Sequence, residues 1–216
     1  MDKKLYTHVV SPQLLSILRT LMASHAFDKF RLVGGTALSL YRGHRVSVDI
    51  DLFTDALYGS IDFEAIDNFL RVTYPYVDTS NYNIVGMGKP YYVGGDKSDC
   101  IKLDLCYTDD FIQDIHRIEG IRLATLEEII AMKIDVILRG GRKKDFWDIH
   151  ELMYDYSIKE MLALHEKRYP YTHDQEVIKA NLSRFTSADE DFDPICLRNK
   201  HWEIIKLEMI DFAKGI

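Results

Sequence analysis

The sequence predicts an α+β fold, in which a small mixed β-sheet flanked by helices precedes a helical half. Short apolar segments with strand-like alternation dominate the first part of the chain. From about Ile115 onward, apolar residues recur instead at helical spacing. We therefore expect a core domain over residues 1–114 and a helical C-terminal domain over residues 115–216.

Length and composition are those of a globular protein, with 216 residues, 47% of them apolar and 28% charged. No apolar run approaches the roughly 20 residues that cross a bilayer, and no signal segment opens the chain, so we expect a cytoplasmic protein with no membrane partner. A net charge of −7 argues against a general nucleic-acid coat protein, although a local basic patch could hold RNA. Cys100, Cys106 and Cys196 lack zinc-ligand spacing, and Cys100 and Cys106 are expected to be reduced packing residues.

Three segments of the first half predict scaffold elements. Ser11 is a helix N-cap followed by Pro12 in the first turn and by leucines at helical spacing. A second amphipathic helix is expected from Asp62 to Tyr74, where Pro75 ends it. The glycine-punctuated stretch 81–94 is typical of a β-hairpin.

A strand, a glycine turn and a short helix follow one another from Phe30. The apolar residues Phe30–Val33 predict the strand, and Gly34 and Gly35 predict the turn. Glycine lets the backbone approach a ligand closely, and the start of a helix points free N–H groups at an anion. This segment is therefore a candidate phosphate cradle.

The next strand carries two carboxylates on one face. Side chains alternate along a strand, so Val48, Ile50 and Leu52 are expected in the core while Asp49 and Asp51 point the other way. Such a pair is either a solvated face or a site where a cation offsets the repulsion. Carboxylate oxygens suit Mg²⁺ or Mn²⁺. A phosphate cradle shortly before a metal-binding pair favours phosphoryl or nucleotidyl transfer.

Asp104 is a third candidate acid. It lies within the alternating strand Asp99–Tyr107, whose other face carries Ile101, Leu103 and Leu105. Adjacent strands lie about 4.8 Å apart, so an acid on a neighbouring strand can complete a cluster that holds two metals. The alternative is a solvent-facing carboxylate beside Lys102.

The helical half opens with a capping box at Thr125 and Glu128, and Gly140-Gly141 ends that helix. Lys133 lies within its apolar stripe, where a lysine ordinarily extends its charge to the edge. The cationic run 139–144 is usually a solvated loop, but beside a nucleotide it would hold phosphates.

The remaining helical pattern is mostly scaffold. Asp145 and Asp148 share one face at the start of the next helix, where the dipole stabilises acids. The stretch 187–194 is expected to be a loop or the edge of a lid. The later apolar positions expected in the core are Met161, Leu162, Leu164, Val177, Ile178, Leu182, Trp202, Ile205, Leu207, Met209 and Phe212.

Taken together, these motifs resemble those of the AbiEii/MenT-type nucleotidyltransferase toxins, within the DNA-polymerase-β-type nucleotidyltransferase superfamily. The matching residues are Gly34-Gly35-Thr36-Ala37-Leu38, Gly43-His44-Arg45, Ser47, Asp49-Ile50-Asp51-Leu52-Phe53 and Lys144-Asp145-Phe-Trp-Asp148. The superfamily usually has Gly-Ser at the turn, so here Thr36 or a backbone amide would serve instead of the hydroxyl.

The resemblance implies a nucleotidyltransferase fold and a metal-dependent enzyme. It would move an NMP from an NTP to a hydroxyl, either at a tRNA 3′ end or on a protein. The protein would be the toxin of an abortive-infection toxin–antitoxin pair of type IV character, silenced by a cognate antitoxin or by a modification within the site, for which Ser47 is a candidate.

Residue roles follow from the same resemblance. Asp49, Asp51 and Asp104 would bind Mg²⁺ or Mn²⁺, and Asp104 would favour deprotonation of the attacking hydroxyl. Lys133 would neutralise charge on the triphosphate, and Asp148 or Asp145 would be catalytic or order the site. The predicted nucleotide-binding residues are Gly34, Gly35, Thr36, Arg45, Ser47, Lys133 and Asp145.

Three other functions share parts of this pattern. A haloacid-dehalogenase-like phosphatase uses Asp-x-Asp but continues with Thr or Val where Phe53 stands here. A sugar-nucleotide glycosyltransferase would place a nucleotide-binding unit well before the acids, and too little chain precedes Asp49. A non-catalytic nucleotide-binding protein on the same fold is the third alternative, against which the intact acids count.

Overall fold

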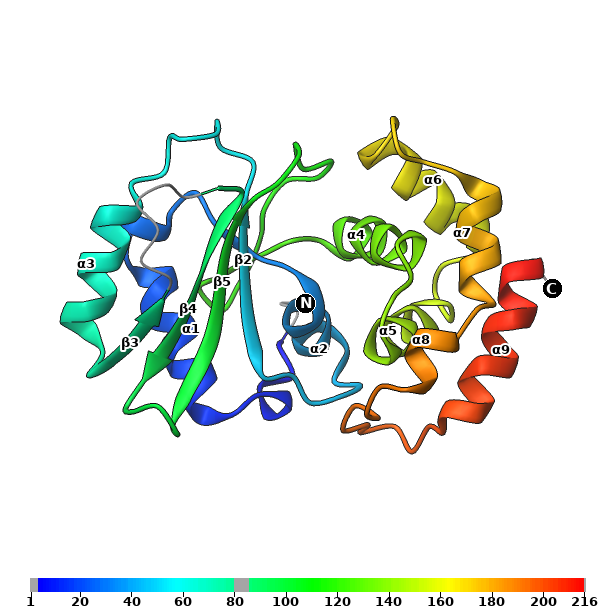
Figure 1. The fold of residues 1–216 in the computed structure, drawn as a ribbon, viewed down its shortest axis with the longest axis horizontal. Helices are drawn as coiled ribbons and strands as arrows, with labels where there is room; N and C mark the ends of the chain where they lie inside the picture. The colour runs from blue at the N-terminus through cyan, green and yellow to red at the C-terminus, as the bar shows by residue number, and fades with distance from the viewer. Residues whose placement is uncertain (1–3, 80–85, 216) are drawn as a thin grey trace.

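A mixed β-sheet forms the centre of the computed structural model, which describes residues 4–79 and 86–215 (Figure 1). Within these residues the strand order is β3-β4-β5-β2-β1-β7-β6. The strands are β1 Arg31–Leu32, β2 Asp49–Thr54, β3 Tyr76–Thr79, β4 Gly88–Gly94, β5 Cys100–Tyr107, β6 His116–Ile118 and β7 Ile121–Leu123. The expected α+β class is confirmed.

Helices cover both faces of the sheet. Figure 1 shows α1 and α3 on one side of it, and α2 with the C-terminal helices on the other. In the part of the chain described, no helix is both long and apolar enough to cross a membrane. The helices are α1 Pro12–Ala23, α2 Gly34–Arg42, α3 Phe63–Thr73, α4 Leu126–Leu138, α5 Lys143–Leu152, α6 Ile158–Arg168, α7 Gln175–Leu182, α8 Thr186–Asp189 and α9 Trp202–Lys214.

The predicted helix starts are confirmed by their caps. Ser11, Asp62 and Thr125 each accept a hydrogen bond from the backbone N–H three residues later. The capping box predicted at Thr125 is confirmed for the Thr125 side chain and wrong for the Glu128 side chain. The Glu128 carboxylate is buried, accepts two backbone N–H groups of the preceding loop and pairs with Arg168, so it does not return to its own N-cap.

Alternation along the two central strands is confirmed, with one correction. Ile50 and Leu52 of β2 and Leu103 and Leu105 of β5 are fully buried on the same face of the sheet. Val48, expected in the core, has 62% of its surface exposed. The strand begins only at the next residue, so the alternation does not extend back to this valine.

The expected change to helical structure near Ile115 is wrong. Residues after it form the short β6–β7 hairpin, and β7 joins the sheet by parallel pairing of Leu123 with Leu32. Glu119 and Gly120 have φ values of 50° and 80°, as a tight two-residue hairpin turn requires. The helical run therefore starts with α4, while the domain division at residues 114 and 115 stays a prediction.

The hairpin expected over residues 81–94 falls partly outside the described residues, which omit positions 80–85. Its second strand is β4, and the partner of β4 lies earlier than expected, in β3. All three cysteines carry free thiols, and Cys100 and Cys106 lie on β5.

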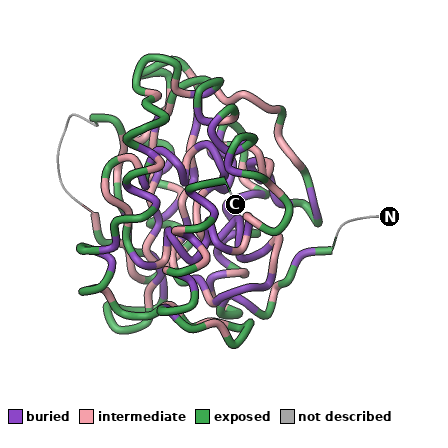
Figure 2. The backbone as a smooth tube through the Cα atoms, turned by 90° about the vertical axis from the view of Figure 1, so that its right-hand side faces the viewer, coloured by how far each residue is buried: buried purple, intermediate pink, exposed green. Residues whose placement is uncertain are grey.

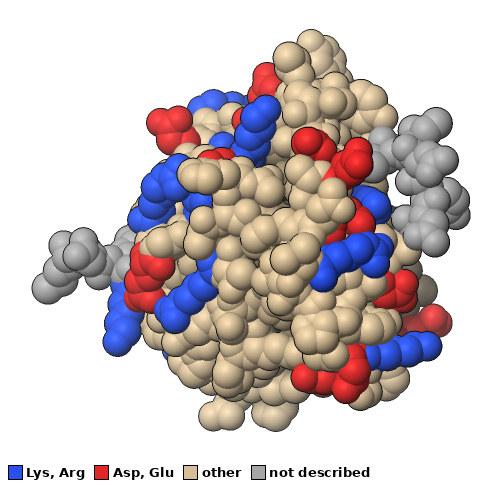
Figure 3. Space-filling model, turned by 90° about the vertical axis from the view of Figure 1, so that its left-hand side faces the viewer, with Lys and Arg blue, Asp and Glu red and all other residues tan. Residues whose placement is uncertain are grey.

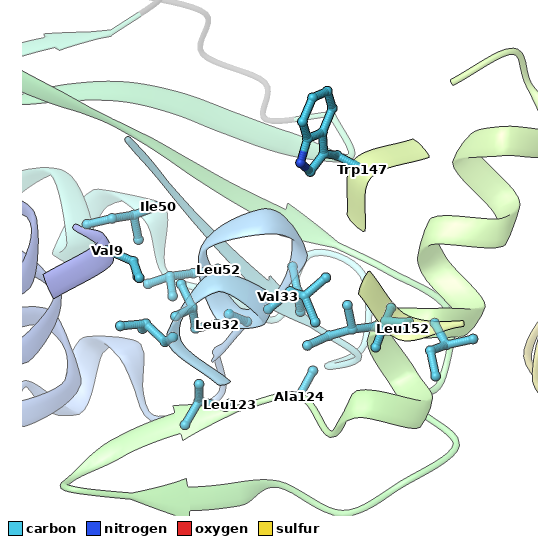
Figure 4. Packing of buried hydrophobic residues seen from close by; sticks show 14 of the residues in the cluster. Val9, Leu32, Val33, Ile50, Leu52, Leu123, Ala124, Trp147 and Leu152 are labelled. Atoms are coloured by element: carbon cyan, nitrogen blue, oxygen red, sulfur yellow. The ribbon is translucent and has the colours of Figure 1, made fainter. Parts of the chain in front are cut away.

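One apolar cluster joins the sheet to the helical half. Figure 4 shows Leu32, Ile50 and Leu52 lying together, and Leu152 of α5 belongs to the same cluster. Buried stretches gather inside the molecule in Figure 2, with exposed segments around them. Two of the expected core positions are wrong, because Val177 of α7 and Leu207 of α9 are exposed.

Charges are mixed on the face that carries α3. Lys and Arg side chains alternate there with Asp and Glu, and neither sign forms a continuous patch (Figure 3). The described residues of this face therefore form no basic track for a nucleic acid.

Candidate active site

The register of β2 and β5 brings the predicted acids to one row. The two strands are parallel, with Asp51 opposite Asp104 and Asp49 opposite Lys102. Directly opposed residues of adjacent strands project from the same face, so all four side chains lie on the face away from the buried leucines. This is the face that α2, α4 and α5 approach (Figure 1).

The surroundings of Asp51 disfavour its ionised carboxylate. Burial raises the pKa of Asp51, and the neighbouring carboxylates of Asp104 and Asp49 raise it further. Lys102 relieves part of this charge through an ion pair with Asp104. A bound cation would relieve the remainder.

The donor set fits a hard divalent cation in kind, because it consists of carboxylate oxygens. Among residues 4–79 and 86–215, no three acidic, histidine or cysteine side chains converge closely enough to hold an ion. The carboxylate of Asp104 is paired with Lys102 in this conformation.

The glycine turn leaves room for two functional side chains. Gly34 has φ of +65°, and a Cβ there would lie 2.9 Å from Oδ2 of Asp51. A Cβ on Gly35 would lie 2.4 Å from Nη2 of Arg45. Any larger residue would displace the Asp51 carboxylate or the guanidinium.

Thr36 and Ser47 brace this turn against the start of β2. Oγ1 of Thr36 donates to the backbone carbonyl of Asp49 at 2.5 Å and shares a hydrogen bond of 2.7 Å with Oγ of Ser47. Both hydroxyls are buried. Their contact with a nucleotide, and modification of Ser47, stay predictions.

A buried charge cluster lies behind the turn, centred on Asp148. Its carboxylate accepts from Nε and Nη2 of Arg45 at 2.6 and 2.8 Å and lies 2.8 Å from Nε2 of His44. Nζ of Lys133 lies 2.6 Å from Oδ2 of Asp148 and 2.6 Å from Oδ1 of Asp145.

The cluster joins three elements that are distant in sequence: the α2–β2 connection, α4 and α5. Burial raises the pKa of Asp148, but Arg45 and Lys133 outweigh it and hold that pKa well below its usual range. Oδ2 of Asp145 also accepts the backbone N–H of Arg142 at 3.0 Å and so caps α5. These contacts tie the α2–β2 connection, next to the turn, to α4 and α5.

A cavity of about 550 Å³ opens between the glycine turn and the helices, within the size range of small-ligand sites. Gly34, Gly35 and Asp51 line its sheet side. Lys133 and Asp145 line the helical side, and so do the three cations Arg139, Arg142 and Lys144. The other predicted site residues are not among the lining residues; they are Thr36, Arg45, Ser47, Asp49, Asp104 and Asp148.

Several residues of this site could not be placed from the sequence pattern alone. Tyr107 follows from the strand pattern, but Tyr169 and Thr172 come from beyond α6 and line the cavity only because the chain folds back over it. His44 was part of the motif without an assigned role, and its contact with Asp148 could not be read from a local pattern.

Three solved structures share this fold, and two of them are described as nucleotidyltransferases. A putative nucleotidyltransferase from Helicobacter pylori has a TM-score of 0.60 and 19% identity, over 94% of this chain and 90% of that one. JHP933 from the same organism has a TM-score of 0.59 and 20% identity, covering 95% and 92%. The toxin MenT4 of Mycobacterium tuberculosis H37Rv has a TM-score of 0.56 and 15% identity, covering 92% and 80%.

Sequence comparison finds one relative and one family model. The uncharacterized protein aq_aa25 of Aquifex aeolicus (strain VF5) is 31% identical over 171 residues, which are 76% of this chain and 77% of that protein. The family model for the nucleotidyl transferase AbiEii toxin of type IV toxin–antitoxin systems matches residues 16–214. The resemblance drawn from the motifs is thereby confirmed. The chain belongs to the AbiEii family of nucleotidyltransferase toxins.

Proposed function

We propose that this nucleotidyltransferase moves an NMP from an NTP to a hydroxyl acceptor with the help of Mg²⁺ or Mn²⁺. The observation that carries the proposal is the register of Asp51 opposite Asp104, beside a cavity large enough for a nucleotide. Cations on the other wall of that cavity match the negative charge of a polyphosphate.

In the proposed reaction, a hydroxyl oxygen of the acceptor forms a bond to the α-phosphorus, and the bond to the β-phosphate oxygen breaks. Pyrophosphate leaves, and the hydroxyl proton passes to the carboxylate of Asp104. Asp49, Asp51 and Asp104 would hold the metal, which neutralises and orients the triphosphate when bound. Gly34 and Gly35 let the backbone approach the phosphates.

The acceptor is proposed from the family and from the charge of the cavity. A tRNA 3′ end would place its phosphates along the exposed cations Arg139 and Arg142, whereas a protein hydroxyl needs no such track. Modification of either acceptor would explain why the protein is toxic. We further propose that a cognate antitoxin binds it and that it acts in the cytoplasm. The acids come from the core half proposed for residues 1–114, and the cations from the helical half proposed for residues 115–216.

The family assignment favours this reaction over the phosphatase, the glycosyltransferase and the non-catalytic binder that share the Asp-x-Asp pattern. A phosphatase would release inorganic phosphate from the γ position. The test below separates these outcomes by following each phosphorus.

To test this, the purified protein is incubated with Mg²⁺ and each of the four NTPs, labelled at either the α- or the γ-phosphorus. Total tRNA or protein is added as the acceptor. We expect the α-label in the acceptor and the γ-label in pyrophosphate, for at least one NTP. A γ-label in the acceptor, or free phosphate as the labelled product, would refute nucleotidyl transfer.

A further inference from the structure

Lys133 is not free to meet a substrate in the structure. Its side chain is buried, and its ammonium lies 2.6 Å from a carboxylate oxygen of both Asp145 and Asp148. With Arg45 also held by Asp148, two cations balance two carboxylates in this cluster. A charge that is already balanced by buried partners has little left for an incoming anion.

The other cavity cations differ in how far they are neutralised. Arg139 pairs with Asp135, and Nε of Arg142 lies 3.9 Å from Oδ2 of Asp145. Both arginines are exposed. A solvated guanidinium gains less from a bound phosphate than a cation that water reaches poorly.

Lys144 is the exception among the cations that line the cavity. It is half-buried, and its ammonium has no hydrogen bond and no ion pair with any residue in the described ranges. Burial lowers its pKa, and the positive charges of Arg142 and Lys133 lower it further. Its charge also reaches Asp51, whose pKa it lowers slightly against the prevailing rise.

We infer that Lys144 is the residue that binds the polyphosphate of the incoming nucleotide, while Lys133 positions Asp145 and Asp148. An anion in the cavity would give Lys144 the partner that it lacks and would lie between it and the acids of β2. This inference rests on the proposed function for the identity of the ligand as an NTP. It places the contact with the polyphosphate on Lys144 of α5, one residue before Asp145, and not on Lys133 of α4.

The test uses inorganic tripolyphosphate with Mg²⁺ as the probe, because it carries the phosphates without a base. Binding is measured by calorimetry for the wild type, Lys144→Met and Lys144→Arg. Lys29→Met is the matched control, since Lys29 is an exposed lysine that does not line the cavity. Lys133→Met is included to separate the two proposed roles.

We expect Lys144→Met to weaken tripolyphosphate binding by about tenfold or more, as loss of a charge-assisted contact does. Its melting temperature should stay equal or rise, because an unpaired cation is removed. Lys144→Arg should retain most of the affinity, and Lys29→Met all of it. Lys133→Met should instead lower the melting temperature, since two buried carboxylates lose their shared partner.

Two outcomes separate this inference from the proposed function. If the wild type transfers nucleotide and Lys144→Met binds tripolyphosphate with unchanged affinity, the inference is overturned and the function stands. If Lys144→Met loses tripolyphosphate binding but the wild type transfers no nucleotide, the polyphosphate site stands and the proposed reaction is overturned.

Discussion

Asp51→Asn should lower the rate of nucleotide transfer by about 10³-fold or more, while the protein stays folded. The carboxylate lines the cavity and lies opposite Asp104, so it is the acid best placed to hold a metal against the triphosphate. Loss of such a ligand removes several kcal/mol of transition-state stabilisation, which corresponds to this factor. Asp49→Asn should act in the same direction. Transfer is measured with the α-labelled NTP.

The stability of Asp51→Asn tests the same site independently. Burial and two neighbouring acids disfavour the ionised carboxylate, so removing its charge should leave the melting temperature unchanged or raise it. Asp78→Asn is the control, since Asp78 is an exposed acid of β3 on the same sheet. It should keep full activity. An Asp51→Asn protein that is folded and active would contradict the site assignment.

Asp148→Asn should lower the free energy of unfolding by about 3–5 kcal/mol, because it leaves Arg45 and Lys133 buried with too little negative charge. The carboxylate has no exposed surface and contacts both cations at 2.6 to 2.8 Å. The measurement is urea unfolding at neutral pH. Asp155→Asn is the matched control, as it removes a half-exposed ion pair with Arg42, which should contribute at most about 1 kcal/mol.

The pH dependence of this difference has a definite sign. The pKa of Asp148 lies well below its ordinary value in the folded protein, whereas an unfolded aspartate titrates near about 3.9. The stabilisation is therefore fully present above about pH 5 and is lost as the pH falls towards the folded value. The gap between wild type and Asp148→Asn should be constant from pH 5 to pH 8 and shrink below pH 4. A gap that widens in acid would contradict the ion-pair account.

Local patterns in the sequence predicted the parts of the site that lie on single elements. Period-two alternation predicted that Asp49 and Asp51 share one face of β2. It also predicted that Asp104 lies on the face of β5 opposite its buried leucines. The N-cap residues Ser11 and Asp62 marked helix starts because capping depends on only three or four neighbouring residues.

Features that depend on distant contacts could not be read in this way. Nothing local shows that β2 and β5 are parallel neighbours in a register that sets Asp51 opposite Asp104. Lys133 stood out as a lysine in an apolar stripe, yet its partners come from α5. The β6 and β7 strands have three residues each, too few for a periodicity to appear, so helical structure was expected there instead.

Binding of Mn²⁺ in the presence of a non-hydrolysable NTP analogue tests the central claim most directly, by electron paramagnetic resonance on the wild type and Asp104→Asn. If acids from both strands share the ion, the wild type should bind Mn²⁺ tightly with the analogue, and Asp104→Asn should lose that binding while keeping its fold. Equal Mn²⁺ affinity in the two proteins would show that β5 contributes no ligand, and the proposed site would be wrong.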